Sequence, residues 1–303
     1  MVVLFILMRT LKKTKGMVIQ KRRRAPHCGI RKLEYYLQEA HFMELTIINT
    51  FTDQPFNGNP AAVCLLTGES DSEWMQRIAK EINMPVTAFI QPHNGEWKLR
   101  WFTPSIEIPI CGHGTLASSF FLWDKGYVPR NQPIAYQTKS GLLTAKFVDG
   151  MVQLEFPSLR EKETAAPDLL IKALGVVPAY VGQNKWDLLV EVQSEEIVRN
   201  LKPDMDSIAQ LPVRGVIVTS QSDNSEYDFV SRFFSPAQGL DEDQVTGSAH
   251  CCLGPYWKSK LDKSIFIAYQ ASERGGLLKV EVTENTVKLS GHAVTIFEGN
   301  LTL

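Results

Sequence analysis

One pattern occurs twice in this chain and constrains its fold more than any other feature. An arginine, an aromatic residue, phenylalanine, a hydroxyl residue and proline stand at 100–104 and again at 232–236. Each copy is followed by a loop with acidic residues, then by a glycine turn, and then by an apolar run. Two long units with the same order of elements are typical of a duplicated domain. The sequence therefore predicts two copies of one topology, over 43–160 and 161–303.

The two glycine turns contain the side chains and backbone N–H groups best suited to bind a ligand. They read Cys-Gly-His-Gly at 111–114 and Thr-Gly-Ser-Ala at 246–249, and each precedes an apolar run that predicts a buried helix, over 116–123 and 249–257. A glycine turn at a helix N-terminus presents free N–H groups and the positive end of the helix dipole, which suit an anion such as a carboxylate. If the two units pack about a pseudo-twofold axis, both turns face one cleft. We then expect an anion between the N–H groups of 112–113 and 247–248.

The rest of the chain predicts an α+β fold in which curved sheets wrap around central helices, twice. A hairpin is expected over 134–147 and 151–156, with its turn at Asp149–Gly150. A polar, charged link between the units is expected over 158–168. Further helices are expected over 71–82, over 168–174 with Gly175 closing it, and around 205–211, and further strands over 45–51, 85–90, 98–102, 186–192, 213–219, 228–234, 266–269, 276–282, 286–290 and 293–300.

Composition argues against several function classes. The 303 residues are 44% apolar and 21% charged, with a net charge of −1, so no electrostatic feature favours nucleic acid or an anionic membrane as partner. The cysteines lack Cys-x-x-Cys spacing, which argues against a disulfide framework or a zinc site and fits a reducing cytoplasm. The Trp and Phe content is compatible with a homodimer. The five cysteines are Cys28, Cys64, Cys111, Cys251 and Cys252.

Residues 1–42 differ from the remainder. Their apolar run over 2–8 is too short to span a bilayer, and the basic residues follow it, whereas a signal peptide places them first. We interpret this segment as an extension, with the folded protein beginning near Met43. A basic arm that binds nucleic acid or membrane is the weaker interpretation, given the neutral remainder.

Seven motifs in one order resemble the PhzF-like family, which is named for the isomerase of phenazine biosynthesis. The resemblance extends from Met43 to the C-terminus. The matching segments are 56–63 (Phe-Asn-Gly-Asn-Pro-Ala-Ala-Val), 102–117, 138–142, 232–236 (Arg-Phe-Phe-Ser-Pro), 242–250, 270–276 and 291–294.

This resemblance implies a diaminopimelate-epimerase-like fold of two pseudo-symmetric domains, each a curved sheet around a central helix. It implies an isomerase that moves a proton on a small carboxylated substrate in the interdomain cleft and uses no metal or organic cofactor. Carried over by motif, the catalytic residues are His113, Asp243 and Ser248, and the substrate-binding residues are Gly112, Gly247, Asn59, Cys111 and Thr246. Simple turn chemistry explains Asn59 equally well, because Asn-Gly-Asn-Pro is a turn signal.

One departure from the family pattern affects the expected mechanism. The family has Asn-x-Ser-Glu-Thr-x-Phe, whose glutamate is the general acid/base, whereas 83–89 here reads Asn-Met-Pro-Val-Thr-Ala-Phe. Val86 stands at the glutamate position and cannot accept a proton. The remaining carboxylates near the turns are those of Glu107, Glu242 and Asp243, and Glu107 belongs to the family pattern in its own right, which favours structural support. We expect the side chain of Val86 to point into the cleft.

Other readings remain open. Cys111 and Thr246 occupy opposing turns, a pairing that fits a dehydratase better than a two-base epimerase, because an ordinary hydroxyl is a poor proton donor. Ser248, His250 and Asp243 include the residue types of a hydrolytic triad, although Ser-x-His spacing in a turn argues against it. A protein that binds a small carboxylate without catalysis would also keep both turns and lose the acid/base.

Overall fold

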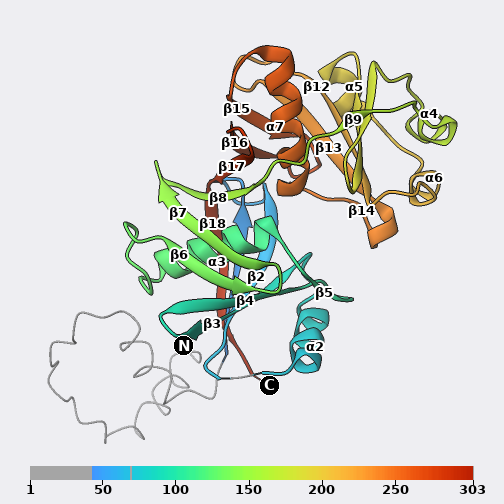
Figure 1. Cartoon of the computed structure of the whole chain (residues 1–303). Helices are drawn as coiled ribbons and strands as arrows, with labels where there is room; N and C mark the ends of the chain where they lie inside the picture. The colour runs from blue at the N-terminus through green and yellow to red at the C-terminus, as the bar shows by residue number, and fades with distance from the viewer. Residues whose placement is uncertain (1–42, 69, 303) are drawn as a thin grey trace, which may run out of the picture.

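The computed structural model describes residues 43–302 except residue 69, so the predicted extension over 1–42 lies outside the described residues (Figure 1). Two successive units make up the described chain. The N-terminal unit consists of β1 (Met43–Thr50), β2 (Asn59–Leu65), α2 (Ser72–Ile82), β3 (Thr87–His93), β4 (Glu96–Phe102), β5 (Glu107–Ile108), α3 (Gly112–Asp124), β6 (Ile134–Thr138), β7 (Gly141–Val148), β8 (Met151–Pro157) and β9 (Lys162–Glu163).

The C-terminal unit follows the short helix α4 (Asp168–Leu174), which Gly175 ends in a left-handed conformation, as the sequence predicts. It consists of β10 (Tyr180–Gln183), β11 (Asp187–Glu191), α5 (Glu195–Asn200), α6 (Met205–Ala209), β12 (Gly215–Gln221), β13 (Phe229–Ser235), the 3-10 turn η1 (Pro236–Gln238), β14 (Leu240–Glu242), α7 (Gly247–Leu261), β15 (Ile265–Gln270), β16 (Gly276–Val282), β17 (Thr286–Gly291) and β18 (Ala293–Leu301).

Strand pairing confirms the predicted duplication. In the N-terminal unit β1–β2 is antiparallel, β2–β3 parallel, β3–β4 antiparallel and β4–β6 parallel. The C-terminal unit repeats this order with β10–β11, β11–β12, β12–β13 and β13–β15. The helices α3 and α7 follow β5 and β14, so the two predicted buried helices occupy equivalent places. The fold is the predicted α+β arrangement of two pseudo-symmetric units.

The ends of the units are exchanged. The last strand of the chain, β18, pairs with β1, and β9 pairs with β10 (Figure 1). In addition, β8 pairs with β17, which joins the two sheets. The domain boundary at residue 160 stays a prediction, and the β1–β18 and β8–β17 pairings cross it. The segment that the sequence predicts as a link contains β9.

Each unit surrounds one buried helix. Nearly every residue of α3 from Gly114 to Trp123 is buried, and α7 is likewise buried from Ala249 to Trp257. A helix that is apolar on all sides belongs in an interior, and Figure 1 shows α3 with β2 and β7 around it. The helix begins at Gly112, four residues before the predicted run, because the Cys111 sulfur caps it by accepting from the Gly114 N–H.

The repeated arginine motif has a structural explanation. Arg100 and Glu107 form a bidentate ion pair with N–O distances of 2.8 Å, and the guanidinium lies 5.2 Å from the Phe102 ring centroid. Arg232 and Glu242 repeat this arrangement, with N–O distances of 2.7 and 2.8 Å. Both glutamates therefore tie β5 and β14 to their neighbouring strands. Both carboxylates are thus held in bidentate ion pairs, which agrees with the structural support expected of Glu107.

Gly215, the first residue of β12, lies against Phe233 and Phe234 of β13 with no room for a side chain. A Cβ at Gly215 would lie 2.5 Å from Phe233 Cζ and 2.8 Å from the Phe234 carbonyl oxygen. Because backbone cannot move away cheaply, we expect Gly215→Ala to lower the free energy of unfolding by about 1–3 kcal/mol. Gly68→Ala is the control, since a Cβ there meets no described heavy atom within 4 Å. Urea unfolding measures both, and equal midpoints would contradict the described contact.

Candidate active site

The two glycine turns meet at the centre of the molecule. A Cβ built on Gly112 would lie 3.9 Å from the Gly247 Cα, and the reciprocal distance is also 3.9 Å. The first N–H groups of α3 and α7 have no partner within their own helices, because helix geometry leaves the first turn unpaired. Two positive helix ends therefore converge on one place. This is the arrangement that the sequence predicts for an anion site, although the anion itself stays a prediction.

Asp243 connects the two units at this place. It follows β14 and is partly buried; its Oδ1 accepts from Asn59 Nδ2 at 2.7 Å, and its Oδ2 accepts from Thr246 Oγ1 at 2.6 Å. Gln270 Nε2 donates to the Asp243 carbonyl at 2.6 Å, and its Oε1 accepts from the Thr246 N–H. Both carboxylate oxygens are thus fixed by donors from different units, which positions Asp243 beside the glycine turns.

Cys111 and His113 form the other side of the site. The Cys111 sulfur lies 3.4 Å from His113 Nδ1. Burial raises the pKa of the Cys111 thiol to about 12, so the sulfur is protonated at neutral pH. Burial also lowers the pKa of His113, and the negative charge of Asp243 opposes that effect. His113 is therefore a neutral imidazole that can accept a proton, with a carboxylate near enough to stabilise the imidazolium.

The Asn59 side chain makes hydrogen bonds within the protein, and its contact with a substrate stays a prediction. Its side chain is completely buried, and its Nδ2 donates to Val245 O at 2.9 Å as well as to Asp243. Its Oδ1 is buried without a partner among the described residues. The preceding turn is anchored from the other unit, because Arg274 Nε donates to the Gly58 carbonyl at 2.8 Å. These contacts assign Asn59 the role of holding Asp243.

Val86 lies directly before β3 rather than within the predicted strand over 85–90. Its side chain is completely buried in the core cluster that also contains Trp101 and Cys111. The Trp101 Nε1 is a buried donor without a partner among the described residues. Whether the Val86 side chain faces a bound substrate stays a prediction. Its surroundings are apolar, so a carboxyl at this position would be strongly desolvated.

Ser248 lies at the second position of α7, and its hydroxyl accepts from Arg214 Nη2 at 2.9 Å. Arg214 is not among the predicted site residues. No local pattern marks its contact with Ser248, because the two residues come together only when β12 and α7 are packed. The nearby His250 is buried against Phe229, with ring centroids 6.1 Å apart, and shares no hydrogen bond with Ser248 or Asp243 among the described residues. The triad reading gains no support from these positions.

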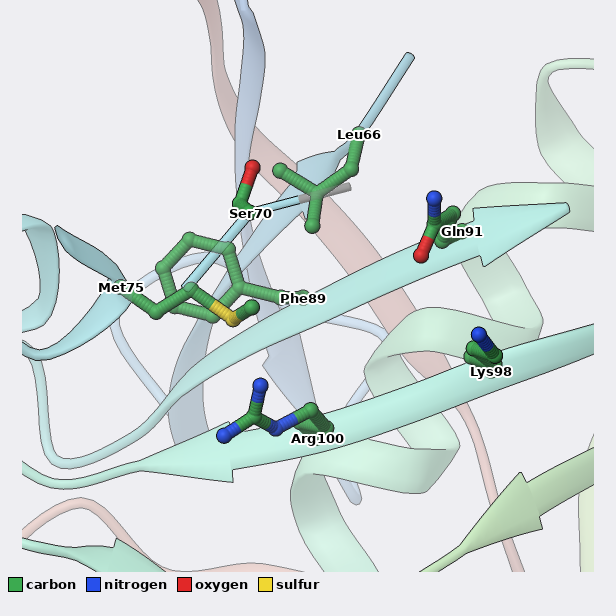
Figure 2. Close-up of a pocket in the computed structure, with 7 residues that line it drawn as sticks. All are labelled: Leu66, Ser70, Met75, Phe89, Gln91, Lys98 and Arg100. Atoms are coloured by element: carbon green, nitrogen blue, oxygen red, sulfur yellow. The ribbon is translucent and has the colours of Figure 1, made fainter. Parts of the chain in front are cut away.

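A separate pocket of about 330 Å³ lies on the outer side of the N-terminal unit. Figure 2 shows side chains from β3, β4 and α2 around it, including Phe89, Met75 and Lys98. Arg100 also lines it, but that guanidinium is already paired with Glu107. None of the predicted site residues lines this pocket. The glycine turns, where titratable groups and helix N-termini converge, therefore stay the predicted site.

Two further observations concern the described residues as a set. Within 43–302, no three side chains of His, Cys, Asp or Glu gather as a metal site would require. No helix in the described part of the chain is long and apolar enough to cross a membrane.

The buried His250 gives the protein a pH-dependent stability. Burial lowers its pKa to about 4, and the bond between its Nδ1 and the Thr246 carbonyl only partly opposes this. The unfolded state, with an ordinary histidine pKa, therefore binds more protons between pH 6.5 and 4. We expect stability to be complete above this window and to fall by up to about 3 kcal/mol as the pH drops through it.

Denaturant unfolding from pH 7 to 4 checks this expectation in wild type and in His250→Gln. In His250→Gln, most of the decrease in the free energy of unfolding between pH 6.5 and 4 should disappear. His292→Gln, at an exposed position, should show the same decrease as wild type. An identical pH slope in wild type and His250→Gln would contradict the assignment.

Comparison with known proteins agrees with this architecture. Residues 48–299 match the model of the family described as phenazine biosynthesis-like protein. An uncharacterized isomerase of Halalkalibacterium halodurans is 49% identical over 258 residues, which cover 85% of this chain and 97% of that protein.

Solved structures give the same result. The crystal structure of a phenazine biosynthesis protein of the PhzF family from Enterococcus faecalis matches with a TM-score of 0.83 and 36% identity, covering 86% of this chain and all of that one. A predicted epimerase from Pseudomonas aeruginosa, at 20% identity, shares the fold with a TM-score of 0.68 over 86% of this chain and 99% of that one.

Proposed function

This chain belongs to the phenazine biosynthesis-like protein family, and we propose that it is an isomerase that moves a proton within a small carboxylate without a cofactor. The observation that carries the proposal is the convergence of two helix N-termini on one place, beside His113 and Asp243. Helix N-termini favour an anion, and a neutral imidazole next to a carboxylate suits proton transfer. The name of the relative from Halalkalibacterium halodurans supports the same reaction class.

In the proposed reaction, the substrate carboxylate binds at the N–H groups of Gly112 and Gly247. His113 accepts the proton from a substrate carbon next to an unsaturated bond, and the electron pair of the broken C–H bond shifts into the π system. The proton then returns from His113 to another carbon of the same substrate, so atoms and charge balance. Asp243 stabilises the transient imidazolium. Because Val86 provides no acid/base, we expect this reaction to be slow.

The experiment follows exchange of substrate protons with solvent deuterium by NMR, using cyclohexa-2,5-diene-1-carboxylate as the probe. Wild-type protein should increase the exchange rate above that of buffer, and His113→Ala should abolish the increase. His93→Ala, at the end of β3, is the matched control and should behave as wild type. Exchange that persists in His113→Ala would contradict the proposal.

One observation favours a second mechanism. Cys111 lies 3.4 Å from His113 Nδ1, a distance at which an imidazole can take a thiol proton. Against it, burial keeps the thiol protonated, and the Thr246 hydroxyl already donates to Asp243. Loss of exchange in Cys111→Ala, in addition to its loss in His113→Ala, would favour this epimerase- or dehydratase-type chemistry, because the first mechanism does not use the thiol. A protein that binds the probe but exchanges no proton would instead be a carboxylate-binding protein.

The proposal includes a cytoplasmic location and a homodimer. The four described cysteines are buried free thiols, which fits a reducing compartment. Size-exclusion chromatography with light scattering measures the oligomeric state.

A further inference from the structure

Arg214 donates a hydrogen bond to Ser248, a predicted site residue in the first turn of α7. It directly precedes β12, and its Nε donates to Asp187 Oδ1 at 2.8 Å while its Nη2 donates both to Asp187 Oδ2 and to Ser248 Oγ. Asp187, the first residue of β11, is completely buried. The three side chains therefore form a chain of hydrogen bonds that leads from the core of the C-terminal unit to the glycine turn.

Several contacts fix the position of this guanidinium. It lies between two aromatic rings, 5.3 Å from the Trp186 centroid and 5.4 Å from the Phe233 centroid. The Arg214 backbone N–H also donates to the Trp186 carbonyl at 2.7 Å. A bidentate carboxylate partner and two flanking rings restrict the rotamers of an arginine strongly. The Nη2 atom is thus held at the Ser248 hydroxyl rather than merely able to reach it.

The bond determines what the Ser248 hydroxyl can do. A serine hydroxyl has one hydrogen to donate and two lone pairs to accept with, and a guanidinium can only donate. With Arg214 donating into the oxygen, the Ser248 hydrogen must point elsewhere, and no described residue accepts it. The free hydroxyl hydrogen belongs to a residue in the first turn of α7, beside the N–H groups that point toward the proposed anion.

We propose that Arg214 is a positioning residue that orients the Ser248 hydroxyl as a hydrogen-bond donor to the bound carboxylate. The inference rests on the proposed function, because it assumes a carboxylate at the glycine turns. It assigns the two turns different tasks: the α7 turn fixes the anion with an added donor, and the α3 turn handles the proton through His113.

The duplication supports this division. Phe102 pairs with Thr87 and the equivalent Phe234 pairs with Val216, so Arg214, two residues before Val216, corresponds to Pro85. Ser248 corresponds to His113, since each is the second residue of its helix. The N-terminal unit keeps the same strand pairing without an arginine there. The fold therefore does not require this chain of hydrogen bonds, which favours a role at the site.

The test compares four full-length proteins: wild type, Asp187→Asn/Arg214→Gln, Ser248→Ala and the triple variant. Changing Asp187 and Arg214 together leaves the net charge unaltered and no buried carboxylate unpaired. Benzoate is the probe, benzamide is its uncharged analogue, and isothermal titration calorimetry gives Kd. A hydrogen bond to a charged group supports an expected weakening of benzoate binding by about tenfold in Asp187→Asn/Arg214→Gln.

The decisive readout is the dependence on Ser248. In the Ser248→Ala background, the same pair of substitutions should change the benzoate Kd by less than about twofold, since Arg214 then has no hydroxyl to orient. Benzamide binding should not respond in either background. Should the double variant fail to fold, Arg214→Lys replaces it. This substitution should weaken benzoate binding by less than tenfold when Ser248 is present, and it should have no effect when it is added to Ser248→Ala.

Equal losses in both backgrounds would overturn the inference, because Arg214 would then act on the anion directly. A benzoate Kd of Asp187→Asn/Arg214→Gln equal to that of wild type, with Ser248 present in both proteins, would also overturn the inference. Arg214 would then have a role in packing alone. Failure of wild type to bind either benzoate or sulfate has a different meaning, because the proposed carboxylate site itself would then be refuted.

Discussion

Val86→Glu is expected to raise the rate of substrate proton exchange by about 10²–10⁴-fold, the usual effect of a positioned acid/base. The resemblance of 83–89 to the family pattern implies a glutamate at this position, and Thr87 and Phe89 match that pattern. Because Val86 is completely buried, the new carboxyl should have a pKa well above that of a free glutamate. Acting as a base, it should make exchange rise with pH through that raised pKa.

Deuterium exchange by NMR from pH 5 to 9 measures this effect. Val86→Gln is the matched control, since it has nearly the same shape but cannot take up a proton, and it should stay at the wild-type rate. Burying a carboxyl also lowers stability, so unfolding is measured in parallel. A well-folded Val86→Glu protein with wild-type exchange would show that this position does not face the reacting carbon.

Asp243→Asn is expected to reduce exchange by about 10²-fold or more, within the range for losing a group that acts in proton transfer. An amide offers one acceptor and one donor, whereas both Asp243 oxygens accept, from Asn59 and Thr246. With its oxygen toward Asn59, the new amide would place its NH2 group at Thr246, whose hydroxyl would lose its present acceptor, and the two charge-assisted bonds would be lost. We expect these changes to lower stability by about 1–3 kcal/mol.

The same substitution changes a neighbouring titration. The charge of Asp243 raises the pKa of His113 against the effect of burial, so its removal should lower the pKa of His113 further. An NMR titration of the imidazole measures this shift. Asp241→Asn, at an exposed position of β14, is the control and should leave both exchange and titration unchanged. An unaltered His113 titration in Asp243→Asn would contradict the described electrostatic contact.

Local sequence patterns predicted the elements of the fold well. The turn at Asp149–Gly150 and the helix that Gly175 ends lie where the sequence predicts them. The predicted single strand over 134–147 is wrong, because a turn at 139–140 divides it into the antiparallel strands β6 and β7. The repeat predicted equivalent helices α3 and α7, because duplicated segments retain the same order of apolar runs. The pairing of β18 with β1 was not predicted, since strand pairing between distant segments leaves no mark in local periodicity.

The candidate site was predictable only in part. Motif positions identified the residues of the turns, but their partners come from distant segments: Asn59 meets Asp243, and Arg214 meets Ser248. A hydrogen bond between residues far apart in sequence depends on packing and cannot be derived from spacing. The start of β3 at Thr87, after Val86, was missed because the Pro85 signal marks the end of the preceding segment rather than the first paired residue.

The central claim is that a small carboxylate binds where α3 and α7 meet. The most direct measurement is a titration of ¹⁵N-labelled protein with benzoate, followed through the backbone amide signals. We predict that the largest shifts occur at Gly112, His113, Gly247 and Ser248, and that benzamide produces none of comparable size. Shifts centred instead on the outer pocket of Figure 2, at Met75, Phe89 and Lys98, would contradict the account.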